Sequence, residues 1–460
     1  EAIADPKQRH ATMEQRRKEV IARCEQRGPE LRCRLASAFG GGQFWLMEQL
    51  ELRDVRLVYA PPDGVGNYGG ETDNWRWPRH AGDVAMLRGY VGKDGKPADY
   101  AEGNVPYRPS RHLKVATDPL RVGDLVFVTG FPASTRRWRT ALEVQEAVSW
   151  EYPMTIDLCD EAIGLLERLG SSDPALAIKG ERLVRGLNNW RTNTRGMLDG
   201  LVKDGLAQRK IDLEVGLQEW IDEQPARKQR YGGVVRRLAK AHEAFRARRA
   251  HDAALEDAVW LGGLLGAADR IVHMAQERPK PDAERDPRFQ QRNHKLMADR
   301  ERANQRTYDR RLDRAKLGLA LRRAARLPEH RRPTLVRLVV GGGEVTDDSI
   351  RSSLDRMYAK TVLEDEGIRL RLLAKASTQE LRRLRDPFID LALKLRPELQ
   401  RIEDGSDEYA GATALDRPLY VAALKEKAGG LLAPDANSTL RITYGTVRGY
   451  RPKPEAEVYD

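Results

Sequence analysis

The spacing of apolar and polar positions divides this chain into a β-rich beginning, a long helical middle and a short β-rich end. Apolar residues recur with a helical period over residues 10–27, which predicts an amphipathic helix. Short apolar runs then alternate with Pro, Gly and Asp, which is typical of short strands joined by tight turns. We therefore expect strands at Val55–Ala60, Val84–Val91, His112–Ala116 and Asp124–Phe131.

The order of these segments predicts the fold class. No helical pattern separates the strands, so an antiparallel barrel or sandwich is favoured over a parallel sheet. From about Thr135 the pattern is helical, and Asp286–Leu327 has so few breaks that it predicts one long helix. Ser438–Pro452 alternates and returns to a β-type composition. The prediction is an α+β protein whose large helical unit is inserted into, or caps, a β domain.

Length and charge refine this division. The chain has 460 residues, which suggests two or more units, and 32% of them are charged, which suits long solvated helices. Lysine and arginine exceed aspartate and glutamate by 80 − 69 = 11. This excess permits nucleic acid or an anionic membrane as a partner but does not require either.

A basic helix around Arg302–Arg337 is the sequence feature that favours nucleic-acid binding. Glu301–Val340 contains 12 Lys or Arg residues against 4 Asp or Glu residues. A non-catalytic helical protein that binds nucleic acid through this face is therefore our alternative function. The segment shows no pattern of aromatic interleaving and no recognition-helix pattern, so a solvated charged helix is the favoured interpretation.

Cysteine usage leaves two interpretations open. Cys24, Cys33 and Cys159 form no C-x-x-C pair, so a zinc ribbon or a thioredoxin motif is excluded. Buried thiols are the ordinary interpretation, and a Cys24–Cys33 bridge is the alternative in an oxidising compartment. No stretch approaches the roughly 18 apolar residues of a membrane span. No signal peptide is recognisable, and the chain begins at Glu1 and ends on "AEVYD", so we expect both ends to be cuts through a longer sequence.

Two glycine motifs and two histidines are expected to have structural roles and not to form binding sites. "DGVGNYGG" has glycines at 64, 66 and 69 in a G-x-G-x-x-G spacing, but a dinucleotide site needs a helix that starts inside the loop. Pro61–Pro62 before it and "ETDNWRWP" after it disfavour that helix, so we expect a glycine-rich turn. "VVGGGEV" (Val339–Val345) is expected to be a helix-breaking linker. His242 and His251 lack an H-E-x-x-H frame and are expected on helix surfaces rather than in a metal site.

The stretch "GGETDNWRWPRHAGD" (Gly69–Asp83) concentrates groups that suit a binding site. An amide oxygen of Asn74 and the indole face of Trp75 would together suit a ligand ammonium group. Asp83 stands just before an expected strand, where an aspartate can orient a histidine as in a Ser-His-Asp triad. The alternative is that the tryptophans belong to the core and Asp83 is a turn acid.

This stretch closely resembles the signature of the bacterial dipeptidyl-peptidase 7 and 11 family of serine exopeptidases (serine peptidase family 46), which remove dipeptides from free N-termini. Further similar blocks occur in the family's order: "DVRLVYAPPDGVGNYGG", "NVPYRP", "VFVTGFPASTRRW", "DPRFQQRN" and "ANSTLRITYGTVRGY". The resemblance covers nearly the whole chain. One departure is Ala133, where the family usually has a second glycine in its turn.

The resemblance implies a fold and a set of residue roles. The fold would be a chymotrypsin-like double β-barrel, incomplete here, with a large inserted all-α cap domain. Residues 1–134 would be part of the barrel domain, 135–432 the cap, and 433–460 the return into the barrel. Asp83 would be the triad acid, and Asn74 and Trp75 would grip the α-amino group of a peptide substrate with a free N-terminus. No cofactor and no metal would be needed.

The resemblance also implies what this chain lacks. In the family the triad histidine lies upstream of this segment and the serine lies downstream, and no serine here has a G-x-S-x-G or G-N-S-G-S-P-like setting. We therefore expect the 460-residue chain alone to be inactive although its parent is a dipeptidyl-peptidase. A homodimer, no nucleic-acid partner, no membrane span, and a periplasmic, secreted or cell-surface location are implied as well. The preference for a hydrophobic or an acidic second substrate residue stays open.

Overall fold

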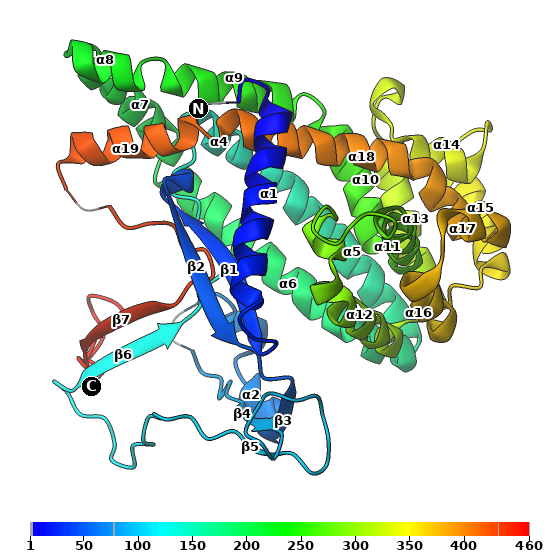
Figure 1. Ribbon diagram of the computed structural model, residues 1–460, viewed down its shortest axis with the longest axis horizontal. Coiled ribbons are helices and arrows are strands. Elements are labelled where there is room, and N and C mark those ends of the chain that lie inside the picture. Colours follow the sequence, from blue (N-terminus) through cyan, green and yellow to red (C-terminus); the bar gives the residue numbers. More distant parts are fainter. Residues whose placement is uncertain (1–2, 77–78, 431, 460) are drawn as a thin grey trace. The chain divides into compact units, whose positions relative to one another are not determined.

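The computed structural model describes residues 3–76, 79–430 and 432–459, which fold into two compact units (Figure 1). The helical unit comprises Glu1–Glu19, Gly69–Arg79 and Thr140–Asp416. The β unit comprises Val20–Tyr68, His80–Arg139 and Arg417–Asp460. Helix α1 (Pro6–Glu25) begins in the helical unit and ends in the β unit. The expected helix over residues 10–27 is therefore present, and it starts four residues earlier.

Helices make up the helical unit almost entirely. In chain order after α1 they are α3 (Gly70–Asp73), α4 (Ala141–Glu146), α5 (Tyr152–Ser172), α6 (Pro174–Lys203), α7 (Leu206–Asp222), α8 (Pro225–Tyr231), α9 (Val234–Arg246), α10 (Arg249–Leu261), α11 (Gly263–Glu277), α12 (His294–Thr307), α13 (Arg310–Ala325), α14 (Thr334–Val340), α15 (Asp347–Lys360), α16 (Glu366–Lys375), α17 (Thr378–Leu384) and α18 (Pro387–Thr413).

Local sequence signals explain where many of these helices start. Thr140 and Glu143 form a capping box that satisfies free backbone N–H groups at the start of α4. The Asp386 carboxylate accepts hydrogen bonds from the N–H groups of Phe388 and Ile389 at the start of α18. Asp173 and Asp309 cap α6 and α13 in the same way. Side-chain caps therefore fix helix boundaries that the sequence pattern leaves approximate.

The core of the helical unit lies between α10, α11, α13, α15, α16 and α18. Helix α18 packs along α11, and α10 packs against α13 (Figure 1). Leu255, Leu317 and Leu395 are fully buried there. Tyr358 and Phe388 meet edge to face with ring centroids 5.0 Å apart. This contact joins α15 to the start of α18.

Within the described residues, the β unit has three small antiparallel sheets. Its strands are β1 (Leu31–Ala38), β2 (Gln43–Leu50), β3 (Asp54–Tyr59), β4 (Met86–Val91), β5 (Val105–Pro106), β6 (Leu125–Gly130) and β7 (Arg441–Thr446), with helices α2 (Asp63–Gly66) and α19 (Asp416–Ala428). The sheets pair β1 with β2, β3 with β4 and β5, and β6 with β7. The expectation of antiparallel rather than parallel pairing is confirmed.

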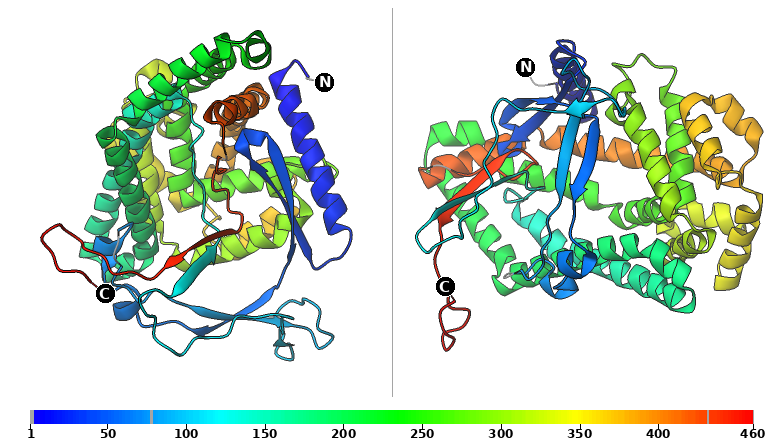
Figure 2. Two further views of the ribbon diagram at one scale, coloured as in Figure 1. Left: turned by 90° about the vertical axis from the view of Figure 1, so that its left-hand side faces the viewer. Right: turned by 90° about the horizontal axis from the view of Figure 1, so that it is seen from below.

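Strands β6 and β7 come from opposite sides of the helical segment in the sequence. Phe127 lies opposite Tyr444 in their register, and Figure 2 shows the two strands side by side. A bridge between Ser134 and Asn437 continues the pairing beyond the strands. The return to β structure expected within Ser438–Pro452 is therefore confirmed, and its partner is the strand expected at Asp124–Phe131.

Many apolar side chains of the β unit face solvent. Leu57, Leu87, Phe127, Val128 and Ile442 are each 64–68% exposed. Exposed apolar strand faces of this kind mark interaction surfaces in folded proteins. The described helices and small sheets together make an α+β fold. The more specific expectation of a double β-barrel remains a proposal.

The cysteine pair resolves the alternatives left open by the sequence. Cys24 and Cys33 form a disulfide bond, so the interpretation of three buried thiols is wrong for this pair. Cys159 is a fully buried free thiol on α5, as the ordinary interpretation expects. Burial raises the pKa of the Cys159 thiol to about 11. This thiol therefore stays protonated and unreactive at neutral pH.

Two secondary-structure predictions are wrong. Residues 112–116 are not a strand, and Leu113 and Val115 are 92% and 90% exposed, because no strand of the described residues pairs with them. The expected long helix in Asp286–Leu327 is instead α12 and α13, separated at Tyr308 and Asp309. Tyr308 is extended, and the Asp309 carboxylate caps the new helix, so a side-chain cap overrides continuous helical periodicity.

Strands β1 and β2 were absent from the sequence predictions. Arg, Ser, Ala and Cys dominate β1, so its alternation is weak, and the pairing of Cys33 with Glu48 is visible only once the hairpin forms. The linker at Val339–Val345 is confirmed, because α14 ends at Val340 and Gly341 adopts φ +89°. That backbone conformation is open to glycine and strained for other residues.

Candidate functional site

The signature stretch is divided between the two units. Gly69–Arg79 belongs to the helical unit, and His80–Asp83 belongs to the β unit. Trp77 and Pro78 lie outside the described residues. Each half is therefore described within its own unit.

The glycine-rich loop before the signature is turn-like with short helical pieces. We expected no helix to start in this loop, but two short helices, α2 and α3, occur there. Each is only four residues long. A single turn lacks the aligned peptide dipoles of a dinucleotide-binding helix. Gly70 adopts φ +47°, in agreement with the expected glycine-rich turn.

Asn74 follows α3 and is oriented by Glu71. Its amide Nδ2 donates a hydrogen bond of 3.0 Å to Oε2 of Glu71. A carboxylate only accepts hydrogen bonds, so this contact fixes which end of the amide faces Glu71. Within the described ranges, the amide oxygen Oδ1 of Asn74 has no hydrogen-bond donor. An acceptor oxygen is therefore directed away from Glu71.

Trp75 is held by its edge and leaves its ring accessible. Its indole Nε1 donates a hydrogen bond of 3.1 Å to the backbone carbonyl of Asn189 on α6, and the residue is 59% exposed. Its backbone φ is +60°, a left-handed conformation that is uncommon for a bulky residue. The alternative that Trp75 is a core residue is therefore wrong.

Asn74 and Trp75 thus place several polar and aromatic groups close together in the sequence. An acceptor oxygen, an accessible indole and the carboxylate of Glu71 lie within five consecutive residues. Such groups attract a cation through hydrogen bonding, ring electrostatics and charge.

Asp83 lies in the extended segment that leads into β4 and is exposed. The backbone N–H of Gly82, the residue before it, donates to the carbonyl of Val65 at 2.9 Å. This bond ties the segment to α2 of the same unit and fixes the backbone next to Asp83.

Sequence reasoning missed Glu71 and Asn189. Glu71 had a weak signal, because it lies three residues before Asn74 and could reach it within one helical turn. Asn189 had none, because its backbone carbonyl is 114 positions from Trp75 and any residue type supplies a carbonyl.

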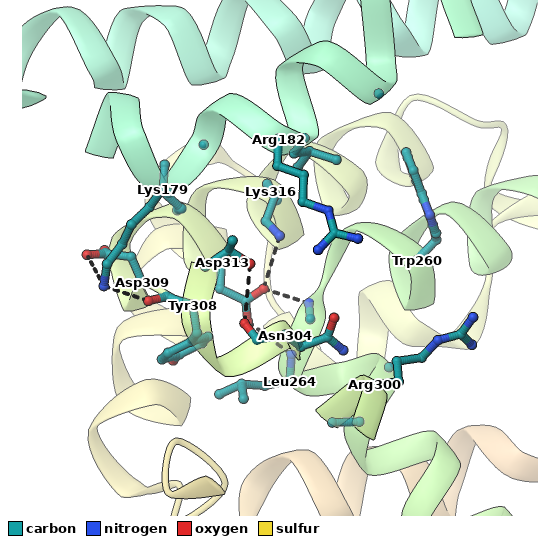
Figure 3. Close-up of a pocket in the computed structure, with 18 of the residues that line it drawn as sticks. Lys179, Arg182, Trp260, Leu264, Arg300, Asn304, Tyr308, Asp309, Asp313 and Lys316 are labelled. Atoms are coloured by element: carbon teal, nitrogen blue, oxygen red, sulfur yellow. Dashed lines mark hydrogen bonds and ion pairs between the residues drawn. The ribbon is translucent and has the colours of Figure 1, made fainter. Parts of the chain in front are cut away.

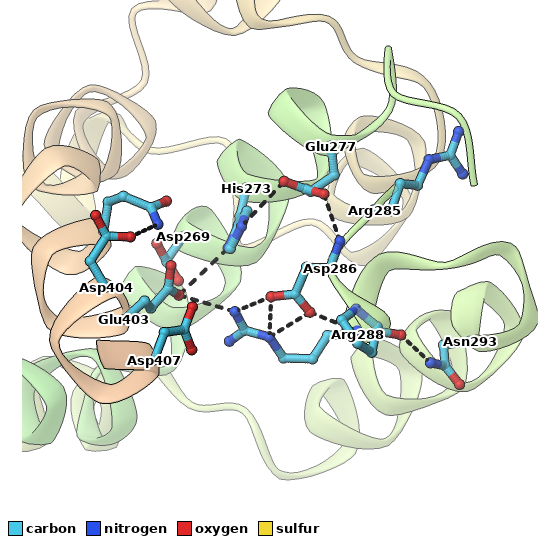
Figure 4. Close-up of polar contacts among 12 residues, drawn as sticks. Asp269, His273, Glu277, Arg285, Asp286, Arg288, Asn293, Glu403, Asp404 and Asp407 are labelled. Atoms are coloured by element: carbon cyan, nitrogen blue, oxygen red, sulfur yellow. Dashed lines mark hydrogen bonds and ion pairs between the residues drawn. The ribbon is translucent and has the colours of Figure 1, made fainter. Parts of the chain in front are cut away.

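The block "DPRFQQRN" (Asp286–Asn293) joins a partly exposed ionic network in the helical unit (Figure 4). The Asp286 carboxylate pairs with Arg288, which also reaches Glu403 on α18 at 3.0 Å. On the same helix, Arg396 donates to Nδ1 of His273 at 3.1 Å. Burial, and then the charge of Arg396, lower the pKa of His273 to about 4. His273 is therefore neutral at pH 7 and its network is structural.

His242 and His251, the two histidines considered in the sequence analysis, pack among the helices. His242 is 9% exposed, so the expectation that it lies on a helix surface is wrong. His251 lies 2.7 Å from Glu398 and 2.8 Å from Asp252. Among the residues that the structure describes, no cluster of three or more His, Cys, Asp or Glu side chains could hold a metal ion.

The basic residues of α13 and its surroundings are engaged with acids from other helices. Arg326 and Arg323 reach Glu161 on α5 at 2.7 and 3.2 Å. Arg311 pairs with Asp173 at 2.7 Å, and Arg314 pairs with Asp355. A basic face that is neutralised in this way gives the nucleic-acid alternative no support.

No helix in the described ranges combines the length and the apolar character needed to cross a bilayer.

Comparison with known proteins gives a consistent result over nearly the full chain. The model of the family described as Peptidase S46 matches residues 1–459. The Asp/Glu-specific dipeptidyl-peptidase of Shewanella putrefaciens is 34% identical over 457 residues, which is 98% of this chain and 61% of that protein. Dipeptidyl-peptidase 7 of Porphyromonas gingivalis is 28% identical over 92% of this chain and 58% of its own length.

The fold comparison agrees. The crystal structure of Porphyromonas endodontalis DPP11 in complex with the dipeptide Arg-Glu matches with a TM-score of 0.73 and 26% identity, covering 96% of this chain and 62% of that chain. This chain thus spans about three fifths of the length of the relatives that it matches. On the family match and these relatives, the chain belongs to the peptidase S46 family.

Proposed function

We propose that this chain is part of a serine-type dipeptidyl-peptidase that releases dipeptides from the free N-terminus of peptides. The observation that carries the proposal is the Asn74–Trp75 element, whose acceptor oxygen and accessible indole lie inside the family signature. The names of the relatives, which are dipeptidyl-peptidases, support the same activity.

The substrate's α-ammonium group would bind at this element. One N–H of the ammonium would donate to Oδ1 of Asn74, and the indole of Trp75 would stabilise the positive charge. Glu71 holds the amide in the orientation that this contact needs. A peptide held by its amino end would present its second peptide bond to the nucleophile, which accounts for dipeptide release.

Asp83 would be the acid of the catalytic triad. It would accept a hydrogen bond from a histidine, fix the tautomer of that ring and stabilise its protonated form. The serine Oγ would attack the carbonyl carbon of the second residue, and its proton would pass through the histidine to the leaving amine. Water would then hydrolyse the acyl-enzyme by the same route. This chemistry uses no metal and no organic cofactor.

The proposed triad histidine and serine come from polypeptide outside these 460 residues. The relatives' greater length supports this, as do the apolar strand faces of the β unit, which further strands of a double β-barrel would cover. The β6–β7 pairing supports a barrel domain made from residues 1–134 and 433–460, with residues 135–432 as the inserted cap.

The Cys24–Cys33 disulfide supports a periplasmic, secreted or cell-surface location, because such bonds persist in oxidising compartments. We also propose a homodimer from the family resemblance, which light scattering of the purified parent protein would test.

The test uses the full-length parent protein and a fluorogenic dipeptidyl amide, offered with a free and with an acetylated α-amino group. We expect hydrolysis of the free amine and at least about a 100-fold loss with the acetylated substrate, because acetylation removes the positive charge. Asn74→Ala should raise KM for the free amine. Equal turnover of both substrates would contradict the proposal.

A second pair of variants tests Asp83. Asp83→Asn should lower kcat by about 1,000-fold or more, because the histidine would lose its orienting acid. Asp94→Asn, which changes an exposed turn acid of the same unit, should leave kcat unchanged. The 460-residue chain alone should show no hydrolysis of either substrate.

A further inference from the structure

A large cavity lies within the helical unit, and its lining residues come from outside the signature stretch (Figure 3). Its volume is about 650 Å³, within the range of sites that hold small organic ligands. Residues of α6, of the α10–α11 junction, of α12 and of α13 line it.

The lining is strongly basic. It includes six cationic side chains and three acidic ones, so its formal net charge is 6 − 3 = +3. These are Lys179, Arg182, Arg270, Arg300, Lys316 and Arg369 against Glu301, Asp309 and Asp313.

Each acid of the lining is already engaged. Glu301 pairs with Arg270 at 2.5 Å and with Arg369 at 3.4 Å. Asp309 lies 3.9 Å from Lys179 and also pairs with Arg311. The three acids therefore leave part of the positive charge of the lining without an acidic partner.

Arg182 on α6 and Arg300 on α12 carry the remaining charge. Neither guanidinium makes an ion pair or hydrogen bond with any residue that the structure describes. Figure 3 shows the Arg182 and Arg300 side chains among the lining residues, on different helices. Arginines without a partner acid are common recognition groups for carboxylates and phosphates.

Two tryptophans also belong to the lining of this cavity. The rings of Trp190 and Trp260 meet edge to face with centroids 5.7 Å apart. They are 40% and 50% exposed, although both belong to the lining. Such rings offer a surface for a flat apolar group.

The lining residue Asp313 is held by several hydrogen bonds. Asp313 accepts hydrogen bonds from the backbone N–H groups of Gly263 and Leu264 at 2.6 and 3.1 Å and from the Tyr358 hydroxyl at 2.7 Å. Its charge is also met by Lys316 at 3.5 Å. Asp313 therefore caps the N-terminus of α11, so these backbone N–H groups are not available to an anion. The groups that remain available are Arg182 and Arg300.

From these observations, we propose that this cavity binds a small organic oxyanion. Arg182 and Arg300 would hold a carboxylate or phosphate, and Trp190 and Trp260 would pack against a flat apolar group attached to it. The site needs only the helical unit and is independent of the proposed peptidase activity.

The test is isothermal titration of the 460-residue chain at low ionic strength, where charge interactions are least screened. The probes are phenyl phosphate, hippurate, inorganic phosphate and neutral benzamide. We expect saturable one-site binding of phenyl phosphate or hippurate, with weaker binding of inorganic phosphate and none of benzamide. Which ring-bearing anion binds more tightly distinguishes a phosphate from a carboxylate ligand.

Variants locate the binding. The double variant Arg182→Gln/Arg300→Gln should weaken the preferred probe by at least about tenfold, because two charge-assisted contacts are lost. Arg168→Gln/Arg331→Gln removes two exposed arginines outside the lining and should leave the affinity unchanged. Trp260→Leu should weaken the ring-bearing probe but not inorganic phosphate. Circular dichroism confirms that each variant is folded.

The proposal is overturned if neither ring-bearing anion binds saturably to the wild-type chain. It is also overturned if the Arg182→Gln/Arg300→Gln variant keeps the wild-type affinity, or if the Arg168→Gln/Arg331→Gln control loses as much affinity.

Discussion

The indole Nε1 of Trp75 donates a hydrogen bond of 3.1 Å to the main-chain carbonyl of Asn189, which lies 114 positions later in the chain. This contact holds a bulky residue at φ +60°, a conformation that costs about 1–2 kcal/mol for a residue other than glycine. The signature loop is thus fastened to helix α6 within the helical unit. The orientation of Trp75, which we propose binds the α-ammonium group of the substrate together with Asn74, depends on this contact.

Replacing Trp75 by Phe keeps an aromatic ring and removes the N–H donor. In the full-length parent we expect KM for free-amine substrates to rise by roughly fivefold, since one hydrogen bond contributes about 1 kcal/mol. The effect on kcat should be smaller, because the catalytic groups are unchanged. Steady-state kinetics with a dipeptidyl amide measures both constants. Trp220→Phe, which alters a tryptophan packed against Arg227, is the matched control and should change neither constant.

Reduction of the Cys24–Cys33 bond should destabilise the β unit. The two cysteines are nine positions apart, and closing a loop of this length stabilises a fold by roughly 2–3 kcal/mol through the entropy of the unfolded chain. Urea denaturation with and without reductant measures the difference.

The same bond predicts a labelling pattern. Iodoacetamide should modify none of the three cysteines of the native oxidised chain, because two are bonded and Cys159 is buried with a raised pKa. Cys24 and Cys33 are buried as well, so labels on all three cysteines should appear only after reduction in denaturant. Mass spectrometry that found Cys159 labelled in the native chain would contradict this account.

His273 should make the helical unit sensitive to acid. Its pKa is lowered to about 4 in the folded chain, against 6.5 for an ordinary histidine. Between these values the unfolded chain binds a proton that the folded chain does not, so stability is present above pH 6.5 and is lost as the pH falls toward 4. Two and a half pKa units correspond to at most about 3 kcal/mol.

The measurement is the urea midpoint between pH 7 and pH 4.5. His273→Gln keeps an acceptor for Arg396 but does not titrate, so its midpoint should fall less than that of the wild type. His330→Gln changes an exposed histidine and should follow the wild-type curve. Parallel curves for the His273→Gln variant and the wild type would exclude this role.

Asp313 should be among the more costly residues to remove in the helical unit. It is 2% exposed and accepts hydrogen bonds from two backbone N–H groups and from Tyr358. Asp313→Ala leaves these donors without an acceptor and should lower the free energy of unfolding by about 3 kcal/mol. Tyr358→Phe should cost less, about 1 kcal/mol, because it removes one donor only.

Chemical denaturation measures both Asp313 and Tyr358 variants. Asp299→Ala is the matched control, since Asp299 forms one exposed ion pair with Arg302, and it should change stability by less than about 0.5 kcal/mol. An Asp313→Ala variant as stable as this control would show that the cap has no energetic role.

The sequence by itself determined the α+β class, the antiparallel strands, the helical middle and the return to β structure near the end. Helical and strand periods are local properties of neighbouring positions, so a single sequence displays them. The proposed site residues Asn74, Trp75 and Asp83 were also named from the sequence, because they lie in one stretch that resembles the family signature.

Only the tertiary structure decided which distant positions meet. The Asn189 anchor of Trp75 is a backbone carbonyl and carries no residue signal. The cavity lining comes from helices far apart in the chain, and the break between α12 and α13 depends on a cap that competes with helical periodicity. Such contacts form only when hydrophobic burial packs separate helices together, and no local pattern specifies their partners.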